Sequence, residues 1–229
     1  QSIVAVFSLP KNKVLAINRA GSILVWSEDK KNYRVSSQAS IPPGVGYVTC
    51  ASLSNGVLLL GLSGGAFSLF DVDSLTSLQS LSVGACVTSV ALSVSGDWAA
   101  IGVAELGQLI VWEWRSETFV LKQQGHFDGV NCVAFSGTIK SGSTDLLDAF
   151  NNSSSFQAGG NLMATGGIEG KIKLWHSVSG FCFATLADHT ASVEALAFTP
   201  QGNAIVSASM DGSVRAFDLV RYRNFRTFT

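Results

Sequence analysis

The segment Gly170-Lys-Ile-Lys-Leu-Trp175 places an aromatic residue five positions after a glycine, at the end of a short apolar run. The same spacing occurs four more times in the 229-residue chain, in Gly21-Ser-Ile-Leu-Val-Trp26, Gly65-Ala-Phe-Ser-Leu-Phe70, Gly107-Gln-Leu-Ile-Val-Trp112 and Gly212-Ser-Val-Arg-Ala-Phe217. The aromatic residues are separated by 44, 42, 63 and 42 positions, so the one long interval is a period of 42 plus 21 inserted residues. A period of about 40–45 residues is typical of four-stranded propeller blades. The sequence therefore predicts an array of five blades.

Each period contains short runs with strand chemistry, separated by Gly, Asn, Pro and Ser. In the last period, Val193-Glu-Ala-Leu-Ala-Phe198 and Ala204-Ile-Val-Ser207 precede the glycine, and in the fourth period the more polar run Phe181-Cys-Phe-Ala-Thr-Leu186 follows the aromatic residue. No segment shows a sustained helical period. We therefore predict an all-β propeller with strands a to d from the inner edge outward, and blades at residues 1–40, 41–84, 85–125, 126–187 and 188–229.

The repeated glycine and aromatic residue both have structural interpretations. The glycine is expected in a tight turn between strands b and c, where a short hairpin connection needs a positive φ. The aromatic residue is expected to pack against the next blade, because one blade cannot bury both of its faces alone. On this interpretation Trp175 lies between the fourth and fifth blades.

Composition favours a soluble intracellular β protein. Hydrophobic residues make up 47% of the chain and charged residues 14%, against about 25% charged in typical domains. No apolar stretch reaches the roughly 18 residues of a membrane span, and the first residues do not read as a signal peptide, so we expect no membrane partner. Four cysteines, Cys50, Cys86, Cys132 and Cys182, form no C-x-x-C pair and are interpreted as small buried hydrophobes in a reducing compartment, with no metal site.

Charge is unevenly distributed although the net charge is only −1. Residues 1–50 carry six basic and two acidic side chains, and residues 201–229 carry four and two. A propeller ring would bring these two segments toward each other, which predicts one basic sector; the alternative is ordinary solvated charge. Net charge alone gives no general affinity for nucleic acid.

The 21 extra residues fall between strands a and b of the fourth repeat, within residues 138–159. Their Ser- and Asn-rich composition predicts a tolerated, poorly ordered surface loop, since long loops lower stability only slightly. The alternative is that Leu146, Leu147 and Phe150 form a short anchor for a partner.

Histidine occurs in two sets of residues that repeat in register with the blades. The fourth repeat contains His126, Thr165, Glu169 and Trp175, and the fifth contains His189, Ser207, Asp211 and Phe217. A hydroxyl, a histidine and a carboxylate can indicate nucleophilic catalysis. Repetition in register favours instead a buried hydrogen-bonded chain that links strands. We therefore predict no catalytic residues and no cofactor or small-molecule substrate, and expect the remaining histidine, His176, to be exposed.

Several of these features resemble WD repeats, a family of seven-bladed propellers that serve mainly as interaction scaffolds. They are the pair Gly125-His126, the turn Asp211-Gly212 and the positions of Trp175 and Phe217-Asp218; the first three repeats lack the histidine and carry Ala20, Gly64 and Leu106 where the turn aspartate is expected. Two longer stretches are similar to the periodic tryptophan protein 2 family: residues 106–128, from Leu-Gly-Gln-Leu-Ile-Val-Trp to Gly-His-Phe-Asp, and residues 218–229, Asp-Leu-Val-Arg-Tyr-Arg-Asn-Phe-Arg-Thr-Phe-Thr.

The resemblance implies a place in ribosome assembly. Members of that family are subunits of the UTP-B subcomplex of the small-subunit processome, which acts with the U-three small nucleolar ribonucleoprotein on pre-ribosomal RNA in the nucleolus. The chain would then supply five of the seven blades of a first propeller, with other UTP-B propeller subunits as partners. Arg221, Arg223 and Arg226 would lie toward a second propeller and are candidate contacts for RNA or a partner.

Two other functions stay open. A generic WD-repeat adaptor, such as a substrate receptor of a ubiquitin ligase, would keep the propeller and change the partners. A propeller enzyme would need polar groups that converge on the central channel, where strand a offers mainly Val, Ala, Ser, Thr and Cys.

Overall fold

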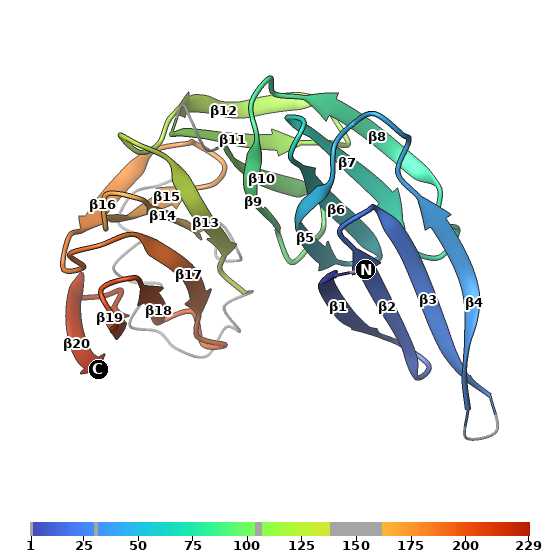
Figure 1. Cartoon of the computed structure of the whole chain (residues 1–229). Coiled ribbons are helices and arrows are strands. Elements are labelled where there is room, and N and C mark those ends of the chain that lie inside the picture. Colours follow the sequence, from blue (N-terminus) through green and yellow to red (C-terminus); the bar gives the residue numbers. More distant parts are fainter. Residues whose placement is uncertain (1, 30–31, 104–106, 138–161) are drawn as a thin grey trace.

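The computed structural model describes residues 2–29, 32–103, 107–137 and 162–229. Within these ranges all regular structure is β: twenty strands form five antiparallel sheets of four strands each (Figure 1). In every sheet the strands are hydrogen-bonded in chain order. The predicted all-β array of five four-stranded blades is confirmed.

Each blade contains four consecutive strands. Blade 1 comprises β1 (Ile3–Leu9), β2 (Lys13–Asn18), β3 (Ser22–Asp29) and β4 (Asn32–Ser40), and blade 2 comprises β5 (Val48–Ser54), β6 (Val57–Leu62), β7 (Ala66–Asp71) and β8 (Ser77–Ser82). Blade 3 comprises β9 (Val87–Leu92), β10 (Trp98–Val103), β11 (Gln108–Glu113) and β12 (Thr118–Gln124). Blade 4 comprises β13 (Val130–Phe135), β14 (Leu162–Gly167), β15 (Ile172–His176) and β16 (Cys182–Leu186), and blade 5 comprises β17 (Val193–Phe198), β18 (Ala204–Ser209), β19 (Val214–Asp218) and β20 (Arg223–Phe228).

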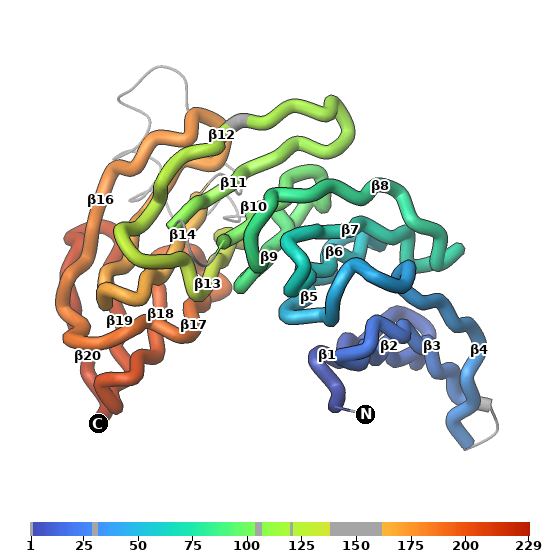
Figure 2. The backbone as a smooth tube through the Cα atoms, turned by 45° about the horizontal axis from the view of Figure 1, so that its top comes forward, coloured from blue at the N-terminus to red at the C-terminus, as the bar shows by residue number. Residues whose placement is uncertain are grey.

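The blades follow one another around an open arc, with blades 1 and 5 at its two ends (Figures 1 and 2). The first strand of each blade lies at the inner edge, where it contacts the first strand of the next blade. Threonine hydroxyls link these inner strands: Thr49 Oγ1 donates to the Val87 carbonyl at 2.7 Å, and Thr88 Oγ1 donates to the Val130 carbonyl. Each such bond satisfies a polar side chain at the channel wall and ties two blades together.

Apolar side chains fill the space between neighbouring blades. Leu15 and Ile23 of blade 1 share a cluster with Leu60 of blade 2, and blades 2 to 5 are joined by three further clusters of the same kind. The central strand β6 is buried along its whole length, because its alternate residues face blades 1 and 3. The core of the protein is therefore divided among the interfaces between blades, as a stacked repeat requires.

The repeated glycines occupy the predicted turns. Gly21, Gly65, Gly107, Gly170 and Gly212 all have a positive φ, between 55° and 89°. Each lies in the turn between the second and third strands of its blade. Residues with a side chain rarely adopt a positive φ, so this turn favours glycine. The predicted role of the motif glycine is confirmed.

The repeated aromatic residues also occupy equivalent positions. In every blade the pairing between the third and fourth strands shifts its register at the aromatic residue, which marks a β-bulge. These positions are Trp26, Phe70, Trp112, Trp175 and Phe217.

The prediction that these aromatic residues pack against the next blade was wrong, because they pack against the preceding one. Trp175 lies in a cluster with Leu109 and Val111 of blade 3, so it is buried between blades 3 and 4 rather than between blades 4 and 5. Trp112 likewise contacts blade 2, where its ring meets that of Phe67 at 5.5 Å. Trp26 belongs to the first blade and is only half-buried, since no described blade precedes it.

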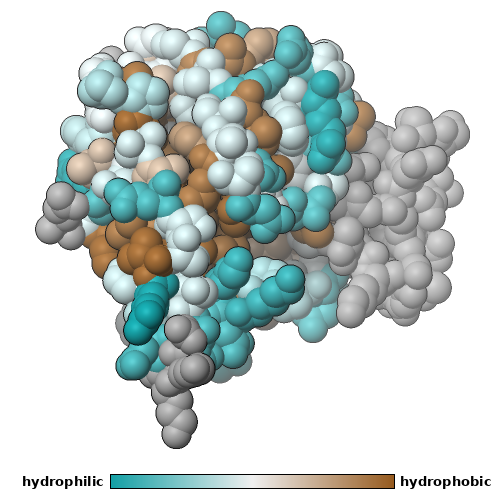
Figure 3. All heavy atoms as spheres, turned by 90° about the vertical axis from the view of Figure 1, so that its right-hand side faces the viewer, coloured by the Kyte–Doolittle hydropathy of each residue, from teal (hydrophilic) through white to brown (hydrophobic). Residues whose placement is uncertain are grey.

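The two ends of the arc leave apolar sheet faces open. On blade 1, Val6 is 58% exposed and is paired through Ala16 to Leu24 on the same face as Trp26. Figure 3 views the molecule from the side of blade 1, where apolar residues lie among polar ones. The basic residues of the first and last blades lie at opposite ends of the arc, so these five blades alone do not bring them into one sector.

Candidate functional site

The histidine of blade 4 is the centre of a buried hydrogen-bonded chain. His126 precedes β13, Thr165 lies on β14, Glu169 lies in the turn after β14 and Trp175 lies on β15. His126 Nδ1 is 2.7 Å from Glu169 Oε1, and His126 Nε2 is 2.7 Å from Thr165 Oγ1. Trp175 Nε1 donates to the same hydroxyl oxygen at 2.9 Å. The structure thus brings together all four side chains of the predicted set.

One arrangement of protons satisfies every bond in this chain. The Trp175 indole can only donate, so the Thr165 hydroxyl accepts from it and donates its own proton to Nε2 of a neutral His126. The Nδ1–H of that tautomer then donates to Glu169. Because Thr165 and His126 are almost completely buried, each of these bonds satisfies a group that water does not reach.

Blade 5 repeats the arrangement with different residues. His189 Nδ1 is 2.8 Å from Asp211 Oδ2, and His189 Nε2 is 2.7 Å from Ser207 Oγ. Phe217 replaces the tryptophan and meets the imidazole edge to face at 6.3 Å. Asp211 also accepts from the Ser213 hydroxyl and from the backbone N–H groups of Ser213 and Thr190, and the Ser213 hydroxyl in particular lowers the pKa of this carboxyl.

The Ser207, His189 and Asp211 distances are those of a catalytic triad, but the surroundings do not suit catalysis. The nucleophile of a triad must reach a substrate carbonyl beside groups that stabilise an oxyanion. Ser207 is 1% exposed and Thr165 is 0% exposed, both between sheets. These hydroxyls therefore have no approach for a substrate, and in blades 4 and 5 the bonds hold the segment that enters the first strand against the second strand.

The free energy of unfolding is expected to rise as the pH increases toward neutrality. Burial lowers the pKa of His126 below 6.5, against the opposing effect of Glu169, so the unfolded chain takes up this proton at a higher pH than the folded chain. The stability contributed by neutral His126 is therefore present above pH 6.5 and is lost as the pH falls through the folded pKa. Urea unfolding at several pH values measures this dependence. The His126→Gln variant should show a flatter dependence, and an unchanged one would contradict the assignment.

The described part of blade 3 lacks the buried hydrogen-bonded network of blades 4 and 5. Ile101 stands on β10 at the position that Thr165 has on β14, and the buried indole nitrogen of Trp112 has no hydrogen-bond partner among the described residues. The turn after β10, with Leu106 at the expected aspartate position, lies outside the described residues. At the same place on the second strand, blades 4 and 5 therefore carry a hydrogen-bonded hydroxyl where blade 3 carries an apolar side chain.

The remaining histidine, His176, and the four cysteines lie outside these networks. The prediction of an exposed His176 was wrong: the ring is half-buried and lies 4.8 Å from the ring of Phe183, and burial lowers its pKa. All four cysteines are free thiols, and burial raises the pKa of Cys50 to about 11 and of Cys132 to about 12. Over the described ranges no three His, Cys, Asp or Glu side chains gather into a possible metal site.

Comparison with known proteins gives one consistent result. Residues 180–218 match the family model described as WD domain, G-beta repeat. Periodic tryptophan protein 2 homologs from Dictyostelium discoideum and Mus musculus are 41% and 44% identical to this chain over 78% and 76% of its length. Periodic tryptophan protein 2 from Saccharomyces cerevisiae is 36% identical over 98% of the chain.

The chain belongs to the periodic tryptophan protein 2 family. It spans only part of those relatives, covering 18%, 17% and 25% of the Dictyostelium, mouse and yeast proteins. Its five blades are WD-repeat propeller blades, and the matched WD repeat ends at Asp218, the last residue of β19.

The three arginines predicted to contact RNA or a partner lie on β20 or just before it. Arg221 Nη1 donates to Asp218 Oδ2 at 3.0 Å, so its charge is partly compensated. The guanidinium of Arg226 lies 5.1 Å from the centre of the Phe228 ring, and Arg223 is exposed at the start of β20. The insertion at residues 138–159, with Leu146, Leu147 and Phe150, lies outside the described residues. Among the residues described, no helix has the length and hydropathy needed to cross a membrane.

Sequence reasoning missed two features of this family member. Ser213 joins the network of blade 5, and the Asp-Gly-Ser order was its signal, since an aspartate often bonds the backbone N–H two residues later. The other feature is a set of exposed apolar residues beside the networks: Phe127, Ile168 and Met210. Each directly precedes or follows a network residue, a coincidence that becomes visible only once exposure is known.

Proposed function

We propose that this chain is part of a non-catalytic scaffold that acts in ribosome biogenesis, as a subunit of the UTP-B subcomplex of the small-subunit processome in the nucleolus. The observation that carries the proposal is the similarity to periodic tryptophan protein 2 relatives over most of the chain. The buried networks support the absence of catalysis, because their hydroxyls are enclosed between sheets. Pre-ribosomal RNA, the U-three small nucleolar ribonucleoprotein and other UTP-B propeller subunits are the proposed partners.

We also propose that two further blades close the ring in the longer protein. The support is the pair of open apolar faces, one beside Trp26 on blade 1 and one beside Val214 and Phe228 on blade 5. Buried counterparts of these faces fill every interface between the described blades. A scaffold of this kind would use the loops at the two ends of the blades for binding, because its sheet faces are used in stacking.

Affinity purification of the full-length protein, followed by mass spectrometry and RNA sequencing, tests the scaffold proposal. The expected result is enrichment of UTP-B subunits, nucleolar assembly factors and pre-ribosomal RNA. Recovery of ubiquitin-ligase subunits without pre-ribosomal RNA would favour the generic adaptor. Sedimentation of the protein only in small complexes, under conditions that preserve pre-ribosomes, would contradict the proposal.

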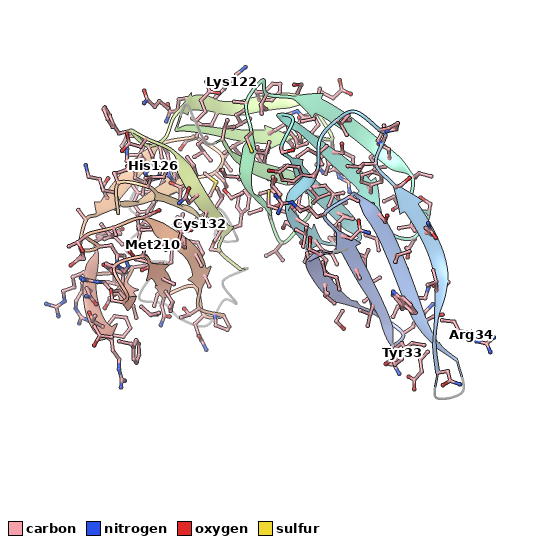
Figure 4. The ribbon with its side chains drawn as sticks, viewed as in Figure 1. Tyr33, Arg34, Lys122, His126, Cys132 and Met210 are labelled. Carbon is pink, nitrogen blue, oxygen red and sulfur yellow. The ribbon has the colours of Figure 1, made fainter. Side chains whose placement is uncertain are left out.

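Replacing Arg221, Arg223 and Arg226 with glutamate tests whether these arginines contact RNA or an acidic partner. Exposed charges change stability by only about 0.5 kcal/mol each, so the variant should fold. Its association with pre-ribosomal particles should weaken, most strongly at low salt, where electrostatic attraction is least screened. Pull-down at several salt concentrations measures this, with Arg34→Glu at the far end of the arc as the control (Figure 4). Association equal to that of the wild type at low salt would show these arginines to be ordinary solvated charges.

A further inference from the structure

Three large apolar side chains are exposed on the connections of blades 4 and 5. Phe127 is 81% exposed, Met210 is 73% exposed and Ile168 is 44% exposed. Phe127 lies between β12 and β13, Ile168 between β14 and β15, and Met210 between β18 and β19. In an antiparallel blade the entry to the first strand and the turn after the second strand lie at the same end. The three side chains therefore belong to one rim of the propeller.

Hydrogen bonds connect the segments that carry these side chains. The backbone N–H of Ile168 donates to the Gly129 carbonyl at 3.2 Å, next to the Phe127 segment. The backbone N–H of Met210 donates to the Ser192 carbonyl at 2.9 Å, and Asn131 Nδ2 donates to Ser192 Oγ at 2.7 Å across the boundary between the two blades. His126 and Met210 accordingly appear on neighbouring blades in Figure 4.

Each exposed side chain is attached directly to a buried network. Phe127 follows His126, Ile168 precedes Glu169 and Met210 precedes Asp211. Since the networks fix His126, Glu169 and Asp211 within the blades, the backbone beside them is held in place. Side chains presented from a rigid backbone lose less conformational entropy when a partner binds. The same positions after the second strand are polar in blades 1 and 2, where Arg19 and Ser63 stand.

The charges around these side chains select the partner. The connections at residues 125–131, 167–171, 187–194 and 209–213 contain five carboxylates, Asp128, Glu169, Asp188, Glu194 and Asp211, and one cation, Lys171. Two cations on the adjoining strands, Arg215 at 3.9 Å from Asp211 and Lys173 near His126, still leave the carboxylates in excess, five against three. This excess of negative charge repels the phosphates of RNA and of anionic lipids. It also disfavours a second copy of the same rim, which would place like charges opposite each other. Apolar anchors surrounded by carboxylates suit a peptide segment with apolar side chains flanked by lysine or arginine.

We propose that Phe127, Ile168 and Met210 form the anchor site for a basic, apolar segment of another protein. This proposal, which rests on the scaffold function proposed above, specifies the rim and the chemistry of one protein partner. Large side chains at the centre of an interface supply most of the binding free energy, and surrounding charges set orientation and association rate.

Site-specific photo-crosslinking of the full-length protein in its own cells tests the site. p-Benzoylphenylalanine replaces Phe127 in one variant and Phe181 in the matched control, because Phe181 is 63% exposed on the opposite end of blade 4. The expected result is an adduct at position 127, absent at position 181, with a peptide that carries apolar residues next to Lys or Arg. No adduct at position 127, the same adduct at both positions, an adduct with RNA or an adduct with an acidic segment would each overturn the proposal.

The triple variant Phe127→Ser, Ile168→Ser, Met210→Ser gives a second measurement, with the double variant Val178→Ser, Phe181→Ser as its control. Recovery of the crosslinked partner should fall about tenfold or more in the triple variant and stay unchanged in the control. Both variants should melt within a few degrees of the wild type, because all five side chains are exposed. Unchanged recovery in a folded triple variant would overturn the site. Failure of the wild-type protein to enrich pre-ribosomal RNA would instead count against the scaffold function.

Discussion

Replacing Trp175 with alanine is expected to lower the free energy of unfolding by about 3–5 kcal/mol. The side chain is 2% exposed and packs between blades 3 and 4, so its removal loses the transfer free energy of the indole and leaves a cavity. The substitution also removes the indole N–H that donates to Thr165 Oγ1 in the buried network of His126. Urea unfolding followed by intrinsic fluorescence measures the change.

The matched control is Trp26→Ala. Trp26 has the same place in the repeat, at the bulge of β3, but it is half-buried because no described blade covers its face. Folding buries less apolar area at Trp26 than at Trp175. The expected loss in the free energy of unfolding is therefore about 1–2 kcal/mol. Equal losses for the two variants would show that packing against the preceding blade is not the source of the effect.

The same pair of variants tests the proposed ring in the longer protein. If a further blade covers the open face of blade 1, Trp26 becomes buried and Trp26→Ala should destabilise that protein by about 3–5 kcal/mol. Fluorescence of the indole should also shift to shorter wavelength when Trp26 leaves water. A Trp26 that stays half-exposed in the longer protein would contradict closure of the ring at this edge.

The period of the motif was sufficient to predict the blades, because the hairpin and the buried aromatic residue each impose a local requirement on the sequence. Gly212 and Phe217 illustrate both, one with its positive φ and the other at its bulge. The period could not say which neighbouring blade the aromatic residue contacts. Alternation along β15 places Trp175 on one face of its sheet, but which face meets which neighbour depends on the direction in which the blades wind around the axis. That direction is a property of the assembled arc.

The networks could be anticipated because their members recur in register. A histidine, a hydroxyl and a carboxylate that return at the same places in two repeats are explained by one buried arrangement, and the observed bonds of His126 and His189 have that form. His176 gave no such signal. It occurs once, and its ring contacts that of Phe183, the residue of β16 at which the register with β15 shifts.

Replacing Gly107 with alanine is expected to destabilise the protein by about 3 kcal/mol or more. A Cβ at this position would overlap the backbone carbonyl oxygen of His126, and the φ of +55° is itself unfavourable for alanine. The carbonyl of Gly107 also accepts the N–H groups of Gly125 and His126, so movement away from the clash would break bonds that hold the segment entering blade 4. Thermal and urea unfolding measure the loss.

Gly212→Ala is the control, since Gly212 has the same place in the motif and a φ of +81° but no atom within 4 Å of an added Cβ. Only the conformational strain remains there, about 1–2 kcal/mol. Gly170→Ala should fall between the two, because its Cβ would lie 2.7 Å from the His189 carbonyl oxygen. If all three variants lost the same stability, the left-handed turn alone would account for the glycine. A graded loss would show that, in blades 3 and 4, the glycine is also needed so that the entry segment of the next blade can pass directly over the turn.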